Sequence, residues 1–137
     1  MNFFFQEISR TTRSSVSQIN QQLKPFGITY SQWVFIVYLS KWSPSPLAPI
    51  ARYYRIEKPA ITQIKKHFFD LGWIEEIPSA DRRERPVQLT KIGLTQFKKI
   101  NSAVRALEAL FLSDLTEKEQ SELVRILTKL NTKELLP

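Results

Sequence analysis

A stretch near the middle of the chain carries side chains suited to reading nucleic acid. From Lys58 to Leu71 apolar residues recur at helical spacing, with Ile61 and Ile64 on one face. The opposite face then carries a hydroxyl, an amide and a cation, which can bond base edges and phosphates in a major groove. A merely solvated helix face has the same composition, so the spacing alone leaves both interpretations open. The candidate DNA-contacting residues of this helix are Lys58, Pro59, Thr62, Gln63 and Lys66.

A second basic cluster follows, in a polar loop over residues 79–85. The loop lies between two predicted strands, residues 73–78 and 86–89, and so forms the tip of a β-hairpin. An arginine on such a tip can enter the minor groove beside a docked helix, and Arg82, Arg83 and Arg85 are the candidates. Asp81 can pair with Arg83 and stiffen the tip. The alternative is a solvated charge cluster that closes a hairpin, and the sequence does not select the inward-pointing arginine.

Other chemistries find little support in the residues. The chain has no cysteine and a single histidine, His67, which disfavours disulfides, thiolate zinc sites and other metal sites. Glu75 and Glu76 are adjacent on a strand and therefore point to opposite faces, so they do not form a catalytic carboxylate pair. No nucleophile with a base and no glycine-rich phosphate loop is evident. We therefore expect no enzymatic activity, no cofactor and no metal.

The elements around the two basic segments follow a recognisable order. Thr29 and Gln32 have capping-box spacing at the start of a helix that is apolar nearly all round and should be buried at the centre. A short helix at residues 47–54 then meets the helix at 58–71 at a tight turn, with Ala51 as the small contact residue and Ile56 in the turn. Arg55 stands where a glycine is common, which is costly if its φ is positive. Four helices, a hairpin and two further helices make a winged helix arrangement.

The sequence predicts long amphipathic helices at the two ends of the chain. One covers residues 2–24, one begins at Thr90 with a heptad-like apolar seam, and the last begins at the capping box of Thr116 and Glu119. Apolar seams on long terminal helices would be exposed in a monomer, which predicts a homodimer; an intrachain core is the alternative. The candidate dimerisation residues are Phe4, Phe5, Ile8, Phe97, Val104, Leu107, Phe111, Leu123, Leu127 and Leu130.

Length and charge limit the classes of partner. The 137 residues correspond to one domain, and the net charge of +7 favours a polyanion or an anionic membrane. The first residues lack the basic and apolar regions of a signal peptide, and no apolar run approaches the length of a membrane span. We therefore expect a cytoplasmic protein with no membrane partner.

The hairpin segment closely resembles the wing of the MarR family. That family has Asp-x-Arg at the wing tip and Leu-Thr leading to a glycine in the next helix. The matching positions here are Asp81, Arg83, Leu89, Thr90 and Gly93. The resemblance implies a mainly α fold with a small β-hairpin wing. It also implies one domain over residues 1–137, with a winged helix-turn-helix lobe at 29–93 and dimerisation helices at 1–28 and 94–137.

The segment from Lys58 to Ile64 also resembles the family's recognition-helix opening, usually Lys-Ser-Thr-Val-Thr-Arg-Leu. Pro59 and Gln63 depart from that pattern, so sequence preference need not follow any relative. The resemblance implies a sequence-specific regulator of transcription that binds duplex DNA, a ligand-responsive repressor acting as a homodimer on a near-palindromic operator. Two alternatives remain open: a winged helix for protein–protein contact without DNA binding, and a non-specific DNA architectural protein.

The family often binds small aromatic effectors in a cleft between the dimer arms and the DNA-binding lobe. By that resemblance an aromatic effector is a possible partner here. Five aromatic side chains are candidates to line such a cleft, and core packing is the alternative role for most of them. These are Trp33, Tyr38, Trp42, Tyr53 and Tyr54.

Overall fold

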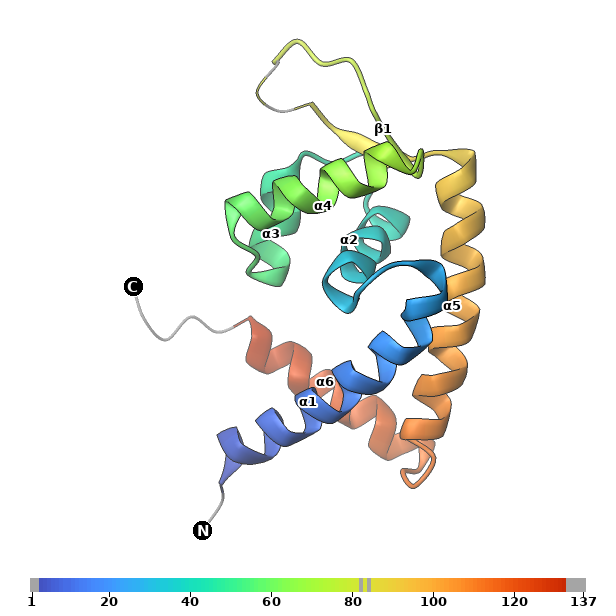
Figure 1. Ribbon diagram of the computed structural model, residues 1–137. Coiled ribbons are helices and arrows are strands. Elements are labelled where there is room, and N and C mark those ends of the chain that lie inside the picture. Colours follow the sequence, from blue (N-terminus) through green and yellow to red (C-terminus); the bar gives the residue numbers. More distant parts are fainter. Residues whose placement is uncertain (1–2, 82, 84, 133–137) are drawn as a thin grey trace. The chain divides into compact units, whose positions relative to one another are not determined.

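The computed structural model describes residues 3–81, 83 and 85–132, and it is mainly α with one small hairpin (Figure 1). This confirms the predicted fold class, and most helix bounds agree within a residue or two. The strands are shorter than predicted. In chain order the elements are α1 (Phe4–Leu23), a 3₁₀ turn η1 (Lys24–Phe26), α2 (Tyr30–Lys41), α3 (Leu47–Tyr54), α4 (Lys58–Asp70), β1 (Ile74–Glu76), β2 (Val87–Leu89), α5 (Lys91–Phe111) and α6 (Glu117–Asn131).

The chain forms two compact units, Met1–Val104 and Arg105–Pro137, and α5 runs from the first into the second. None of the helices in the described part of the chain is long and apolar enough to cross a bilayer.

Helix α2 lies at the centre of the first unit, as its all-round apolar sequence predicts. Gln32 accepts a hydrogen bond from the backbone N–H of Thr29 at 3.0 Å, which closes the predicted capping box. Phe35 is fully buried and stacks on Phe68 of α4, which in turn stacks on Trp73. The aromatic stack therefore joins α2, α4 and the entry to the hairpin in one core.

The tight turn between α3 and α4 has the strain that its sequence predicts. Arg55 ends α3 with φ +55°, in the left-handed region that favours glycine. The N–H of Ile56 donates to the carbonyl of Ala51 at 2.9 Å, which closes the turn. Leu71, expected to continue the apolar stripe of α4, is instead exposed, because the helix ends at Asp70.

The hairpin is held at its root by backbone pairing. Ile74 lies opposite Leu89 and Glu76 opposite Val87. Ser45, in the segment before α3, exchanges two backbone hydrogen bonds with Val87 at 2.8 and 3.0 Å, so the hairpin gains an additional bridge to that segment. This pairing fixes the direction in which the wing leaves the lobe.

The Leu-Thr-x-x-Gly spacing after the wing has a physical reason. The hydroxyl of Thr90 donates to the carbonyl of Gly72 at 2.6 Å and accepts from the N–H of Gly93 at 3.1 Å, which caps α5. A Cβ at Gly93 would lie 2.0 Å from the carbonyl oxygen of Trp73. Only glycine lets α5 approach the entry to the hairpin this closely.

The second unit contains the end of α5 and helix α6, which a short capped corner joins. Thr116 and Glu119 form the predicted capping box at the start of α6. The side-chain amide of Gln120 donates to the carbonyls of Leu112 and Leu115, both at 3.1 Å, which satisfies the end of α5. None of the described residues of α6 is buried.

Candidate nucleic-acid interface

Helix α4 presents a polar face to the surface because its apolar face packs into the core. Ile61, Ile64 and Phe68 are buried, and helical geometry turns the intervening residues outward. Figure 1 shows α4 lying across one side of the lobe, leading directly into the hairpin. The five candidate contact residues Lys58, Pro59, Thr62, Gln63 and Lys66 are all exposed.

The partners of these side chains show which groups remain available. The hydroxyl of Thr62 donates to the carbonyl of Lys58 at 3.0 Å, so its oxygen is left as an acceptor. Lys66 donates to Asp70 at 2.8 Å, and that contact raises the pKa of Lys66 first by hydrogen bonding and then by charge. Both side chains are well exposed, so the pair is weak and a phosphate can compete for Lys66. Within the described residues the amide of Gln63 has no partner, and it remains free to bond an adenine edge.

A groove of about 880 Å³ lies between α3, α4 and the hairpin. Its apolar part comes from Leu47, Ala51, Ile56 and Ile61. Positive side chains gather around this apolar part, a distribution suited to phosphate groups or to an anionic ligand with an apolar body. The cationic residues that line the groove are Arg52, Lys58, Lys65, Arg83 and Arg85.

Two of these cations were absent from the sequence-based set of contacts. Arg52 lies on α3, whose outward face was not considered, although Ala48 and Arg52 are spaced i, i+4 and both line the groove. Lys65 lies on the side of α4 next to the hairpin, where it donates to Glu76 at 2.6 Å. Only the tertiary arrangement of α3, α4 and the wing brings these cations together.

The wing arginines are placed differently from one another. Arg83 is exposed and lines the groove, whereas Arg85 donates to Glu76 at 3.2 Å. Asp81 accepts from the backbone N–H of Arg83 at 2.9 Å. The expected pairing of their side chains is replaced by this tight local turn, which a short aspartate side chain reaches easily. Arg82 lies outside the described residues.

Comparison with known proteins relates this geometry to transcriptional regulators. No family model matches the chain. The chain is 29% identical over 114 residues to the uncharacterised HTH-type transcriptional regulator YwoH of Bacillus subtilis, covering 83% of each chain. It is 28% identical over 116 residues to the HTH-type transcriptional repressor Rv2887 of Mycobacterium tuberculosis, covering 84% of each.

Solved structures agree over nearly the whole length. The MarR family protein Rv2887, solved with p-aminosalicylic acid, has a TM-score of 0.77 at 27% identity and covers 96% of this chain and 100% of its own. The chain therefore shares the fold of a MarR family protein. A mutant form of Escherichia coli MarR, solved with operator DNA, shares the fold with a TM-score of 0.80 at 20% identity, covering 95% of this chain and 99% of that one. The curated relatives are named as regulators of transcription.

The residues expected at a dimer interface fall into two groups. Phe97 stacks on Trp33 with ring centroids 5.5 Å apart, and Val104 is buried in the same core. Intrachain packing, the alternative considered for the seam, accounts for both. The members that are at least partly exposed in the single chain are Phe4, Phe5, Ile8, Leu107, Phe111, Leu123, Leu127 and Leu130.

The aromatic residues considered for an effector site also divide. Trp33 is core, whereas Tyr38, Trp42, Tyr53 and Tyr54 form a patch at the ends of α2 and α3. Burial first, and then the neighbouring tyrosines, raise the pKa of Tyr54 to about 12. The rings contact one another, with Trp42 and Tyr53 centroids 5.4 Å apart, and no slot for a planar ligand opens between that pair.

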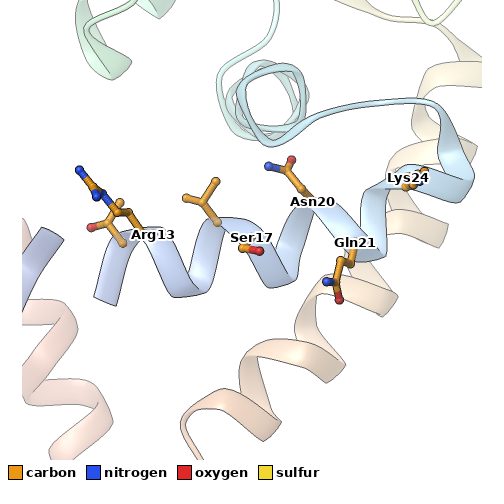
Figure 2. A pocket seen from close by; sticks show the side chains of 7 residues that line it. Arg13, Ser17, Asn20, Gln21 and Lys24 are labelled. Carbon is orange, nitrogen blue, oxygen red and sulfur yellow. The ribbon is translucent and has the colours of Figure 1, made fainter. Parts of the chain in front are cut away.

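A second hollow runs along one face of α1 and η1 (Figure 2). Its lining comes from this continuous helical segment alone, between Thr12 and Lys24. Asn20, one of the lining residues, accepts from the backbone N–H of Tyr30 at 2.8 Å and thereby ties α1 to the start of α2. A hollow with a single helical wall resembles an uncovered helix face more than an enclosed ligand site.

Proposed function

We propose that this chain is a cytoplasmic, sequence-specific DNA-binding regulator of transcription, a ligand-responsive repressor that acts as a homodimer on a near-palindromic operator. In this proposal α4 enters the major groove and the wing reaches the adjacent minor groove of the same half-site. Phosphate contacts by lysine and arginine supply most of the affinity, and base-edge contacts supply the preference.

The exposed polar face of α4 beside a cationic groove is the observation that carries the proposal. A solvated helix face needs no particular neighbours, whereas here five cations from α3, α4 and the wing line one hollow next to Thr62. Concentrated positive charge along a concave surface suits a duplex backbone. A winged helix used only for protein contact would have no need of it.

The relatives support the same function. Rv2887 is described as a repressor and has been solved with DNA and with salicylic acid. Escherichia coli MarR has been solved with operator DNA. The proposed homodimer rests on the exposed apolar faces of the terminal helices, which the single chain leaves uncovered.

The test begins with selection of genomic fragments by the full-length protein, followed by salt titrations on the selected duplex and a scrambled one. Gln63→Ala should relax preference at one base pair of each half-site, by about 1–3 kcal/mol of discrimination, and leave the salt slope nearly unchanged. Arg83→Ala should weaken binding to most sequences and make the salt slope shallower by about one per half-site.

Matched controls come from α1. Gln21→Ala and Arg10→Ala make the same chemical changes on exposed positions away from the groove and should leave both readouts unchanged. Affinity that is insensitive to salt would favour the protein-contact alternative. Equal affinity for selected and scrambled duplexes would favour a non-specific architectural protein. If Arg82, Arg83 and Arg85 can all be replaced by alanine without loss of affinity, the wing does not contact DNA.

We further propose that an aromatic acid relieves repression by this protein. The groove combines apolar side chains with guanidinium groups, which suits a ring carrying a carboxylate. Salicylate should lower operator affinity in a competition assay, whereas benzyl alcohol, which lacks the charge, should not. Equal effects of the two compounds would argue against an anion-binding effector site.

A further inference from the structure

The cationic groove contains one feature that its DNA-binding role does not explain. Among the described residues that line it, Glu76 is the one carboxylate. An acidic side chain facing a duplex backbone repels phosphate and lowers affinity. Its position therefore calls for a compensating role.

Glu76, on β1, connects α4 to the segment that precedes β2. One carboxylate oxygen, Oε1, accepts from Nζ of Lys65 on α4 at 2.6 Å. The other, Oε2, accepts from Nη1 of Arg85, which lies just before β2, at 3.2 Å. A single side chain on β1 thus joins three segments that are separate in sequence.

The Lys65–Glu76 pair is more shielded than the ion pairs elsewhere in the described chain. The side chains of Lys65 and Glu76 are 23% and 29% exposed, whereas those of the Lys66–Asp70 pair are 73% and 59% exposed. Charge-assisted hydrogen bonds in a partly shielded position are stronger and better oriented than surface pairs. The hydrogen bond from Lys65, followed by that from Arg85, lowers the pKa of Glu76, so the carboxylate stays ionised at neutral pH.

Two cations of the groove are therefore held in place rather than left free. Lys65 and Arg85 point at Glu76, and its charge offsets part of theirs. Free cations add affinity for any duplex, because phosphates are the same in every sequence. Discrimination instead requires α4 and the wing to keep a fixed relation while they contact adjacent grooves.

We propose that Glu76 is a specificity-determining positioning residue. It fixes the wing on the recognition helix and withholds Lys65 and Arg85 from indiscriminate phosphate binding. This inference rests on the proposed DNA-binding function, and it adds a residue whose negative charge improves the ratio of operator to non-operator affinity.

The neighbouring residue supplies a matched control. Glu75 precedes Glu76 on β1 but points to the opposite face, where it accepts from Nε2 of Gln88 at 2.9 Å. Glu75→Gln and Glu76→Gln remove the same charge from adjacent positions. Any difference between the two variants reports on the contacts of Glu76 and not on the net charge.

The experiment compares full-length wild type, Glu76→Gln and Glu75→Gln on operator and scrambled duplexes over a salt series. Glu76→Gln should raise scrambled-duplex affinity roughly threefold to tenfold and steepen the salt slope by about one per protomer, because freed cations reach phosphate. Operator affinity should not rise in proportion, so the operator-to-scrambled ratio should fall roughly tenfold. Glu75→Gln should keep the wild-type ratio.

A third variant separates anchoring from charge release. Lys65→Gln also breaks the link to α4 but frees no cation on that helix, so it should lower the ratio without steepening the salt slope. A Glu76→Gln ratio equal to that of Glu75→Gln, or a uniform loss on both duplexes with altered thermal unfolding, would overturn the inference while leaving the proposed function intact. A wild-type protein that binds neither duplex would refute the proposed function and this inference together.

Discussion

The helix-turn-helix lobe and the terminal helices both carry large apolar side chains, but they differ in how many of these side chains are buried within the chain. In the lobe, Phe35, Ile50 and Phe68 are fully buried within the chain. On the terminal helices, Phe5 is 80% exposed and Leu110 is 72% exposed, and no described residue of α6 is buried. The same residue types therefore complete a core in one region and leave an open apolar surface in the other.

The lobe is thus stabilised by its own packing, whereas the terminal helices expose surface that a soluble monomer rarely leaves uncovered. Stability and association should then respond to mutations in different regions. Substitutions in the lobe should change unfolding, and substitutions on the terminal helices should change assembly. The following predictions test that separation, in decreasing order of the free-energy change that we expect.

Phe68→Ala should destabilise the lobe by about 3–5 kcal/mol, because it removes a ring that stacks on both Phe35 and Trp73. Phe69→Ala is the matched control, since its ring is 51% exposed on the same helix, and its cost should stay at about 0.5 kcal/mol. Urea unfolding followed by circular dichroism measures both. Similar losses at the two positions would show that the core is not where the structure places it.

Gly93→Ala should cost about 3 kcal/mol, at the upper end of overpacking effects, because its Cβ would meet the backbone of Trp73. Gly27→Ala provides the comparison: its φ is +74° but no atom lies within 4 Å of the added Cβ. That change should cost only about 1 kcal/mol. Thermal unfolding of both variants distinguishes a packing cost from a backbone cost, and equal shifts would exclude close packing as the cause.

Leu130→Glu should weaken dimerisation by about 2 kcal/mol, roughly thirtyfold in Kd, while the lobe keeps its fold. Leu130 is exposed in the single chain, so its loss opens no cavity. Thr128→Glu adds the same charge on another face of α6 and should leave association unchanged. Sedimentation equilibrium at micromolar concentration measures the association of each variant. A wild-type monomer under these conditions would refute the proposed dimer.

Arg55→Gly should stabilise the protein by about 0.5–1 kcal/mol, because it relieves a left-handed φ at the turn between α3 and α4. Arg52→Gly, three residues earlier within α3, should instead destabilise by about 1 kcal/mol. The two identical substitutions thus have opposite expected signs. Chemical unfolding of both variants checks this, and a loss at Arg55 would mean that its side chain contributes more than its backbone costs.

Local sequence rules predicted much of the fold. The capping residues Thr29 and Thr116 mark helix starts because their side chains bond backbone groups within one turn. The spacing of Ile61, Ile64 and Phe68 defined the buried face of α4, and therefore the exposed one. The predicted strands extended one or two residues beyond the observed ones.

The candidate site was predictable only in part. Gln63 and Lys66 follow from helical periodicity, which is a local property of the chain. Arg52 was missed because its place in the groove depends on the packing of α3 beside α4 and the wing. The sequence also did not show how the apolar seam divides. Phe97 packs on Trp33, a residue distant in the sequence, whereas Phe111 stays exposed.

Capping and periodicity act within a few residues, so the amino-acid sequence was enough to define the elements, their order and the outward face of α4. Which charges meet depended instead on tertiary packing. Lys65, Glu76 and Arg85 come from a helix and the two sides of a hairpin, and no spacing rule links them. Their contact exists because Phe68 and Trp73 stack in the core and set the wing against α4, which brings one carboxylate within reach of two cations.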